Sequence, residues 1–250
     1  AEWHELVEDS FGALVEGKPA YFQVRLIGIA DEGRELVRLD NQDGRIVSTP
    51  PELLQRKGDR DYFLETLQTP GGAVYLSEIN LNRDFGQITE PQIPTLRSAR
   101  ILETQDGTLH SMLVINVDLR GLLTELRSIV GEKAYLILAN ADGDYLLHPD
   151  PSRTFGSDLG TGFNFHADFP GLRGVSAEWI TLPTGAMGFS PTVAGGFPLM
   201  PGSDREMFVA VVHPADSLVQ DLQAARNRAV LYTVIAAVGA VLAVVLAARL

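Results

Sequence analysis

Cysteine is absent from this 250-residue chain. Without cysteine the protein can form neither a disulfide scaffold nor a thiolate site. Positive charge is also scarce, since 20 lysines and arginines stand against 32 aspartates and glutamates, for a formal net charge of −12. Binding to nucleic acid needs clustered lysine and arginine, so no nucleic-acid partner is expected.

Signatures of catalysis and metal binding are missing as well. The chain has no glycine-rich phosphate loop, no G-x-S-x-G motif and no catalytic cysteine, so we expect no catalysis in this segment and no cofactor. Asn140–Asp144 begins like a calcium loop, but its glycine stands at position 4 instead of 6 and Pro151 replaces the glutamate at position 12. We interpret it as a hairpin turn. The His-x-Asp pairs at His148 and His166 lack a third ligand, so no metal is expected.

One long apolar run is present, from Ala229 to Ala248, and only Tyr232 and Thr233 in it are polar. At about 1.5 Å of rise per residue, a helix of this length spans about 30 Å, the thickness of the hydrocarbon core of a bilayer. A buried helix of a soluble domain is the alternative, but such a helix normally has a polar face. The run therefore predicts a transmembrane helix at 229–248, after a juxtamembrane helix at 217–228.

The rest of the chain mixes helical and strand-like patterns. Residues 1–18 predict an amphipathic helix, whose apolar stripe consists of Trp3, Leu6, Val7, Phe11 and Leu14. Strand-like runs follow between residues 21 and 130, with helical stretches at Pro51–Lys57, Asp59–Gln68 and Leu119–Val130. The pattern predicts an α+β fold dominated by antiparallel strands.

Two pairs of segments indicate an internal repeat. Leu39–Val47 and Leu138–Leu146 each carry an Asp-Gly turn between strands, and they lie 99 residues apart. Met112–Asp118 and Met207–His213 each lead into a predicted helix, and they lie 95 residues apart. The similar offsets predict two tandem modules, at 19–130 and 131–216.

Six segments stand out in order and spacing: YFQVR at 21–25, ELVR at 35–38, LQRKGDRDYF at 54–63, VYLSEINLN at 74–82, EPQIP at 90–94 and VINVD at 114–118. Together they resemble the double Cache (dCache) extracytoplasmic sensors of bacterial histidine kinases, diguanylate cyclases and chemoreceptors. The resemblance implies a long N-terminal helix that carries a membrane-distal and a membrane-proximal PAS-like module. It also implies a first membrane span before Ala1, and a bacterial inner-membrane protein with residues 1–228 in the periplasm.

The resemblance also implies a ligand site in the distal module. Amino-acid-binding members combine an arginine, two aromatic residues, a strand tyrosine and a terminal aspartate, which match Arg60, Tyr62, Phe63 and Asp118, whereas Ile79 replaces the strand tyrosine. Arginine can hold a carboxylate, aspartate can pair with an ammonium group, and aromatic walls exclude water. The alternatives are a helix cap for Asp118 and a surface ion pair for Arg60.

Strand alternation extends this site. Tyr75 and Ser77 share one face of their strand, and Asn116 shares a face with Asp118. The predicted ligand-binding residues are Arg60, Tyr62, Phe63, Tyr75, Ser77, Asn116 and Asp118. Their chemistry suits a small carboxylate, an amino acid or an amine.

The polar residues of the first two strands are treated differently. Gln23, Arg25, Glu35 and Arg38 lie on strands that are expected to pair. We interpret them as a structural polar ladder and leave them out of the site.

The leading functional hypothesis is a small-molecule sensor that transmits ligand occupancy through the C-terminal membrane helix. The receptor is expected to be a sensor histidine kinase or a diguanylate cyclase, with any enzymatic activity in a cytoplasmic domain. The alternative is a membrane-anchored ectodomain for protein interaction without a small-molecule ligand. We also expect a parallel homodimer, formed through the stripe of helix 1–18 and through small residues of the span such as Ala236 and Ala240.

Overall fold

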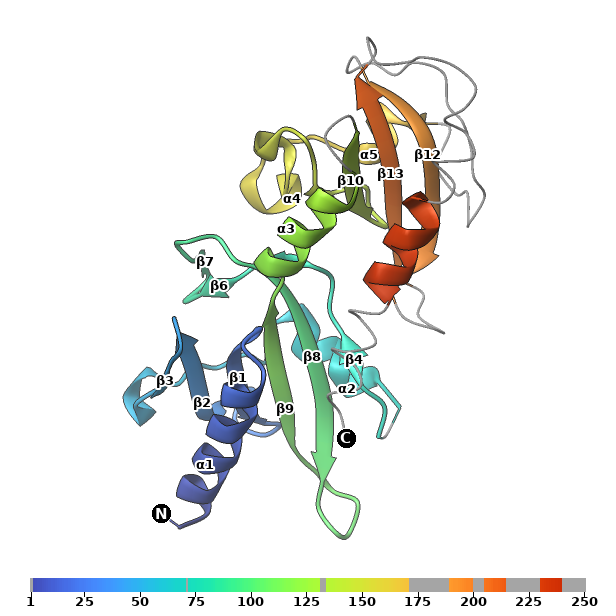
Figure 1. The fold of residues 1–250 in the computed structure, drawn as a ribbon. Coiled ribbons are helices and arrows are strands. Elements are labelled where there is room, and N and C mark those ends of the chain that lie inside the picture. Colours follow the sequence, from blue (N-terminus) through green and yellow to red (C-terminus); the bar gives the residue numbers. More distant parts are fainter. Residues whose placement is uncertain are drawn as a thin grey trace. The chain divides into compact units, whose positions relative to one another are not determined.

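The computed structural model describes residues 2–70, 72–130, 134–170, 189–199, 205–214 and 230–239. The chain divides into two compact units, Ala1–Leu119 and Arg120–Leu250. Each unit is built on its own antiparallel sheet (Figure 1). The predicted α+β fold with an N-terminal helix and antiparallel sheets is confirmed, while the predicted module boundaries at 130/131 and 216 stay predictions.

The first unit consists of two helices, a short 3-10 turn and strands of very unequal length. The helical elements are α1 (Glu2–Gly17), η1 (Pro51–Leu53) and α2 (Asp61–Gln68). The strands are β1 (Tyr21–Gly28), β2 (Glu35–Gln42), β3 (Arg45–Ser48), β4 (Tyr75–Leu76), β5 (Asn80–Leu81), β6 (Arg83–Asp84), β7 (Gln87–Ile88), β8 (Pro94–Glu103) and β9 (Leu109–Asp118). The main sheet has the order β3-β2-β1-β9-β8-β4, β5 also pairs with β8, and β6 and β7 form a separate ribbon.

Helix α1 packs on one face of this sheet. Val7 and Phe11 contact an apolar cluster of β1 and β2, and Val15 is buried. Trp3 and Leu6, near the N-terminal end, are 54% and 68% exposed. The predicted stripe is therefore divided between a part that contacts the sheet and a part that remains exposed.

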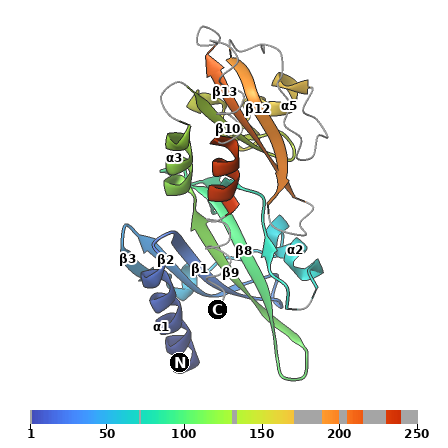
Figure 2. The ribbon, with the colours of Figure 1, turned by 45° about the vertical axis from the view of Figure 1, so that its right-hand side comes forward.

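Helix α2 covers the opposite face of the same sheet (Figure 2). Neighbouring residues of a strand point to opposite faces. Leu26 of β1 belongs to the α1 cluster, whereas Ile27 packs with Tyr62 and Phe63 of α2. The predicted site residues Tyr62 and Phe63 therefore lie on the face of the sheet opposite to α1.

The prediction of a helix at Pro51–Lys57 is wrong, because only the short 3-10 turn η1 forms there. The following residues pair with a distant part of the chain instead. Glu35 N–H donates to the Gln55 carbonyl at 2.8 Å, and Lys57 N–H donates to the Gly33 carbonyl at 2.9 Å. These long-range bonds satisfy the backbone and override the local helical pattern.

Both predicted Asp-Gly hairpins are confirmed. Asp43 (φ 53°) and Gly44 (φ 90°) join β2 to β3, and Gly143 (φ 86°) lies in the turn between β10 (Tyr135–Asn140) and β11 (Tyr145–Leu147). Positive φ at these positions is what a tight hairpin turn requires.

The alignment of these two hairpins as a repeat is wrong. β10 pairs with β11 and β13 (Glu206–Pro214), just as β1 pairs with β2 and β9. The counterpart of β10 is therefore β1, whereas the repeat aligned it with β2. The second predicted match, between Met112–Asp118 and Met207–His213, does join equivalent strands, because these segments lie in β9 and β13.

The second unit has a smaller sheet with the order β11-β10-β13-β12. Its remaining elements are α3 (Arg120–Ile129), η2 (Pro151–Arg153), α4 (Gly156–Leu159), α5 (Phe165–Asp168) and β12 (Phe189–Pro198). An apolar cluster that includes Ile137, Tyr145, Phe165 and Phe208 covers one face of the sheet.

The predicted membrane span lies only partly within the described residues. Residues 230–239 are helical, with Leu231, Val234 and Val238 buried. Among the described residues, no helix is both long and apolar enough to cross a membrane. The predicted juxtamembrane helix at 217–228, and residues 229 and 240–248 of the predicted span, lie outside the described residues.

Candidate functional site

The start of α2 carries three of the predicted residues. Arg60 precedes the helix with an extended backbone (φ −86°, ψ 138°), and its carbonyl accepts the N–H of Phe63 at 2.9 Å. The Arg60 side chain is half-buried and forms no ion pair or hydrogen bond with the described residues. The surface ion pair considered for Arg60 is therefore not formed there. Tyr62 and Phe63 are both buried against the sheet.

Tyr62 contacts a buried arginine, Arg25 of β1, which is 3% exposed. Arg25 Nη1 donates to the Tyr62 hydroxyl at 3.0 Å and lies 3.4 Å from Glu35 Oε1, and Nη2 donates to Asn116 Oδ1 at 2.8 Å. The Arg25 guanidinium also lies 5.3 Å from the centroid of the Tyr62 ring, which is within cation–π distance. Arg25 therefore connects β1, β2, β9 and α2.

Asn116 is the predicted site residue that lies deepest in this polar network. Its Nδ2 donates to Gln23 Oε1 at 3.1 Å and to Asn82 Oδ1 at 3.4 Å, in addition to the bond that it accepts from Arg25. Asn116 is 1% exposed. Its amide thus orients Arg25 and Gln23 on the face that α2 covers.

The other three predicted residues have different surroundings. Tyr75 packs against the cluster of Tyr62 and Phe63, and its hydroxyl donates to Glu65 Oε2 at 2.8 Å. The Ser77 hydroxyl bonds to backbone groups on two sides, since it accepts the Arg97 N–H and donates to the Glu78 carbonyl. Asp118 ends β9, opposite Thr95 and two residues before α3. Tyr62, Phe63 and Tyr75 thus pack together, and Asn116 is connected to Tyr62 through Arg25. The Ser77 hydroxyl, in contrast, bonds only to neighbouring backbone groups among the described residues.

A second chain of polar contacts lies on the same unit. Lys57 Nζ donates to Gln55 Oε1 at 2.7 Å, and Gln55 Nε2 donates to Asp84 Oδ1 at 2.6 Å. Arg38 holds the two oxygens of Asp84 at 3.1 and 3.0 Å. Burial alone would raise the pKa of Asp84, but the hydrogen bonds from Arg38 and Gln55 outweigh it and lower that pKa to about 2.

The contacts of Asp84 predict a loss of stability in acid. Because its folded pKa of about 2 lies below the ordinary 3.8, Asp84 stabilises the fold above pH 4, and this stabilisation is lost as the pH falls toward 2. With 29% of the side chain exposed, we expect Asp84→Asn to cost about 1–2 kcal/mol at pH 7. Urea unfolding at pH 7 and pH 3 measures the effect, and the cost should shrink at pH 3. An equal cost at both values would contradict the assignment. The control is Asp9→Asn, because Asp9 is exposed and its carboxylate forms no hydrogen bond or ion pair with the described residues.

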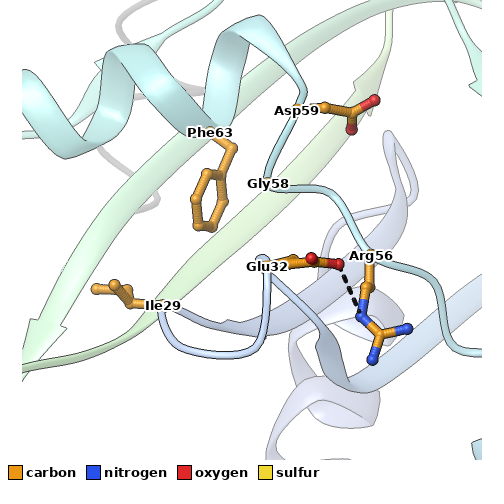
Figure 3. A pocket seen from close by; sticks show the side chains of 7 residues that line it. Ile29, Glu32, Arg56, Gly58, Asp59 and Phe63 are labelled. Atoms are coloured by element: carbon orange, nitrogen blue, oxygen red, sulfur yellow. Dashed lines mark ion pairs between the residues drawn. The ribbon is translucent and has the colours of Figure 1, made fainter.

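An open pocket of about 530 Å³ lies beside the start of α2, a volume in the range of small-molecule sites (Figure 3). It is lined by Ile29, Glu32, Gly33, Arg56, Gly58, Asp59 and Phe63. Arg56 lies 3.3 Å from Glu32 and 3.1 Å from Asp31. Phe63 is the predicted site residue that lines the pocket, and the neighbouring Tyr62 belongs to the Arg25 network.

The back wall of this pocket is a contact between two backbones. Gly58 N–H donates to the Glu32 carbonyl at 2.9 Å. A Cβ on Gly58 would lie 2.5 Å from Glu32 O, and a Cβ on Gly33 would lie 2.7 Å from Gly58 N. Gly33 has φ +67°, and Asp31 and Glu32 before it also have positive φ. Only glycine allows so close an approach at these two positions.

The second unit has a smaller polar cluster. The Tyr145 hydroxyl donates to Asp168 Oδ2 at 2.5 Å, and Arg153 Nη1 donates to the same oxygen at 3.1 Å. His148 is 2% exposed, accepts the Asp150 N–H on Nδ1 and leaves Nε2 without a partner among the described residues. Burial lowers the pKa of His148, so the imidazole is neutral near pH 7.

The sequence reasoning missed the residues at the centre of the first unit. Arg25 and Glu35 do lie on paired strands, as predicted, but Arg25 also reaches α2 and β9, and Lys57 was not considered. A signal was available in β1, where Gln23 and Arg25 alternate with Val24 and Leu26. That alternation places a charge on a strand face that α2 also covers, so the charge had to be buried.

Comparison with known proteins gives one family match. A family model described as the sensor domain of bacterial histidine kinases matches residues 2–173. A search of curated protein sequences gives no significant match.

Solved structures with the same fold come from several signalling proteins. A domain of a sensory box/GGDEF family protein from Vibrio parahaemolyticus matches with a TM-score of 0.69 and 21% identity, over 85% of this chain and 78% of that one. The extracellular domain of a protein named as a histidine kinase, vpHK1S-Z8, has the same score and identity, over 88% and 78%. The ligand-binding domain of the Pseudomonas aeruginosa PAO1 amino acid chemoreceptor PctB, in complex with L-Arg, matches at 0.51 and 13%, over 85% and 82%.

Proposed function

Because the chain belongs to the family of bacterial histidine kinase sensor domains, we propose that its first unit binds a small molecule on the α2 side of the sheet. The observation that carries the proposal is that Phe63, which lines the pocket, packs in one cluster with Tyr62, and Tyr62 accepts a hydrogen bond from the buried Arg25. A pocket of about 530 Å³ with an aromatic wall and nearby fixed charges suits a small polar ligand.

The proposed ligand is a small carboxylate, an amino acid or an amine. The L-Arg complex of PctB supports this range, since that protein shares the fold. We keep Arg60, Tyr62, Phe63, Tyr75, Ser77, Asn116 and Asp118 as the proposed ligand-binding residues. The Arg60 guanidinium has no hydrogen bond or ion pair among the described residues, so it can bind a carboxylate without losing a contact there. The Ser77 hydroxyl would first have to leave its backbone partners.

The wider arrangement of the receptor is also part of the proposal. Residues 1–228 lie outside the cytoplasm of a bacterium, the run at 229–248 crosses the inner membrane, and two copies associate in parallel. Ligand occupancy then reaches a cytoplasmic histidine kinase or diguanylate cyclase through that helix. A ligand can do this only by binding one arrangement of the unit better than another.

Thermal unfolding of the purified chain in mild detergent tests the proposal. Amino acids, organic acids and amines are added singly, and a ligand at 100 times its Kd adds about 2.7 kcal/mol, or roughly 5–10 °C in Tm. Arg60→Ala should leave the Tm without ligand unchanged and weaken the ligand at least roughly tenfold, because a charge-assisted hydrogen bond is lost. Arg45→Ala, an exposed arginine of β3, is the matched control. If no compound of any class raises the Tm, a protein-interaction ectodomain becomes the better interpretation.

A further inference from the structure

Lys57 is a buried lysine with few partners. It is 6% exposed, and its backbone is fixed on both sides, because Lys57 N–H bonds to Gly33 O and Gly58 N–H bonds to Glu32 O. A lysine ammonium has three N–H donors. One of them bonds to Gln55 Oε1, and no carboxylate lies within ion-pair distance of Lys57 among the described residues. A buried charge with so little compensation lowers the stability of the fold.

Arg25 has a similar shortage of negative charge. Its Nε is buried and has no hydrogen-bond partner among the described residues, and the carboxylate oxygen that it pairs with, Glu35 Oε1, is 3.4 Å from Nη1. The other oxygen of Glu35 accepts the Gln55 N–H at 2.9 Å. Asp84, the other acid that acts on Lys57, already accepts hydrogen bonds from Arg38 and Gln55. Arg25 and Lys57 therefore share one fully buried carboxylate.

The protonation of Lys57 agrees with this geometry. Its pKa is lowered to about 8, first by burial and then by the charge of Arg25. The charged groups that surround it are Arg25 of β1, Glu35 and Arg38 of β2 and Asp84 of β6, and the two acids do not offset the lowering. An added anion at this position would stabilise the ammonium form and raise the pKa again.

The pocket beside α2 is next to the segment that carries Lys57. Arg56 and Gly58, on either side of Lys57, both line the pocket, and so does Phe63, which follows Tyr62 in α2. The backbone of Lys57 therefore runs beside the pocket, while the buried Lys57 and Arg25 side chains are not part of the pocket lining. A ligand oxygen that replaced Gln55 Oε1 as the acceptor of the Lys57 ammonium would connect the ligand to Lys57.

We propose that Lys57 and Arg25 form an anion-binding subsite, which takes the carboxylate of a small organic acid when the Gln55 contact of Lys57 is released. The inference rests on the proposed function and narrows its ligand class. It adds Lys57 and Arg25, two residues absent from the predicted set, to Arg60 as groups that bind the carboxylate. Amines without an acidic group would not fill this subsite.

Thermal shift and titration calorimetry on the purified chain test the subsite. Acetate, lactate and succinate are compared with the uncharged acetamide, lactamide and succinamide and with ethylamine. We expect at least one acid to raise the Tm and its amide to have no effect. Lys57→Met should weaken that acid by roughly 10- to 100-fold, and Lys57→Arg should weaken it less. Lys57→Met removes a poorly paired buried charge, so the variant should fold at least as well as the parent chain.

Proton uptake distinguishes direct binding from a structural effect. Near pH 8 about half of the Lys57 side chains are neutral, so binding of an anion should take up a fraction of a proton. Calorimetry in two buffers with different ionisation enthalpies measures this uptake, which should vanish in Lys57→Met. If amines or neutral compounds raise the Tm and the acids do not, or if Lys57→Met binds the acid unchanged, the subsite is wrong while the sensor function stands. If no compound of any class binds, both proposals fail.

Discussion

Glu35→Gln is expected to lower the free energy of unfolding by about 3–5 kcal/mol, because Glu35 is the fully buried carboxylate beside Arg25. The amide keeps the size of the side chain and an oxygen that can accept the Gln55 N–H. It removes the negative charge on which both Arg25 and Lys57 depend. Urea unfolding followed by circular dichroism measures the loss.

Two further variants show whether charge is the cause. Glu65→Gln changes an exposed carboxylate that accepts a bond from Tyr75, and it should cost less than about 0.5 kcal/mol. Adding Lys57→Met to Glu35→Gln should recover part of the stability, since one of the two uncompensated cations is then gone. A loss that is equally large with and without Lys57 would show that Glu35 compensates Arg25 alone and that Lys57 does not depend on it.

Gly58→Ala is expected to cost about 2–4 kcal/mol. Its Cβ would lie 2.5 Å from Glu32 O and 2.7 Å from Glu32 C, and these are backbone atoms that cannot rotate away. The two segments would have to separate, which breaks the bond from Gly58 N–H to the Glu32 carbonyl and weakens that from Lys57 N–H to the Gly33 carbonyl. Chemical denaturation again measures the change.

Gly121→Ala is the matched control, because Gly121 lies in α3 and an added Cβ there meets nothing within 4 Å. Alanine in a helix should stabilise the protein by about 0.5–1 kcal/mol. Opposite signs for the two substitutions are therefore expected. If Gly58→Ala unfolds at the same urea concentration as the parent chain, the close backbone contact behind the pocket does not exist in solution.

Local signals were enough to predict much of the fold. The Asp-Gly pairs at 43–44 and 142–143 predicted two hairpins, because the positive φ of Gly44 and Gly143 is a local requirement of such turns. The helix at 51–57 was wrong because the partners of that segment, Gly33 and Glu35, are distant in the sequence. A local pattern carries no information about such partners.

The site was predicted less completely than the fold for a related reason. Tyr62 and Phe63 could be found through their resemblance to a known family, and they lie together against the sheet. Arg25 and Lys57 could not, because the feature that distinguishes them is a shortage of carboxylates around two buried cations. That shortage depends on which acids Arg38 and Gln55 already occupy, and only the folded arrangement determines this.

The attachment of α1 to the sheet gives the helix the properties of a lever. Val7, Phe11 and Val15 hold the middle and the C-terminal end of α1 against the sheet, while Trp3 near the other end is 54% exposed. At about 1.5 Å per residue, its 16 residues extend about 24 Å. A tilt of about 5° at the sheet would therefore move the N-terminal end of α1 by about 2 Å. Small adjustments around the sheet are thus magnified at the opposite end of the helix.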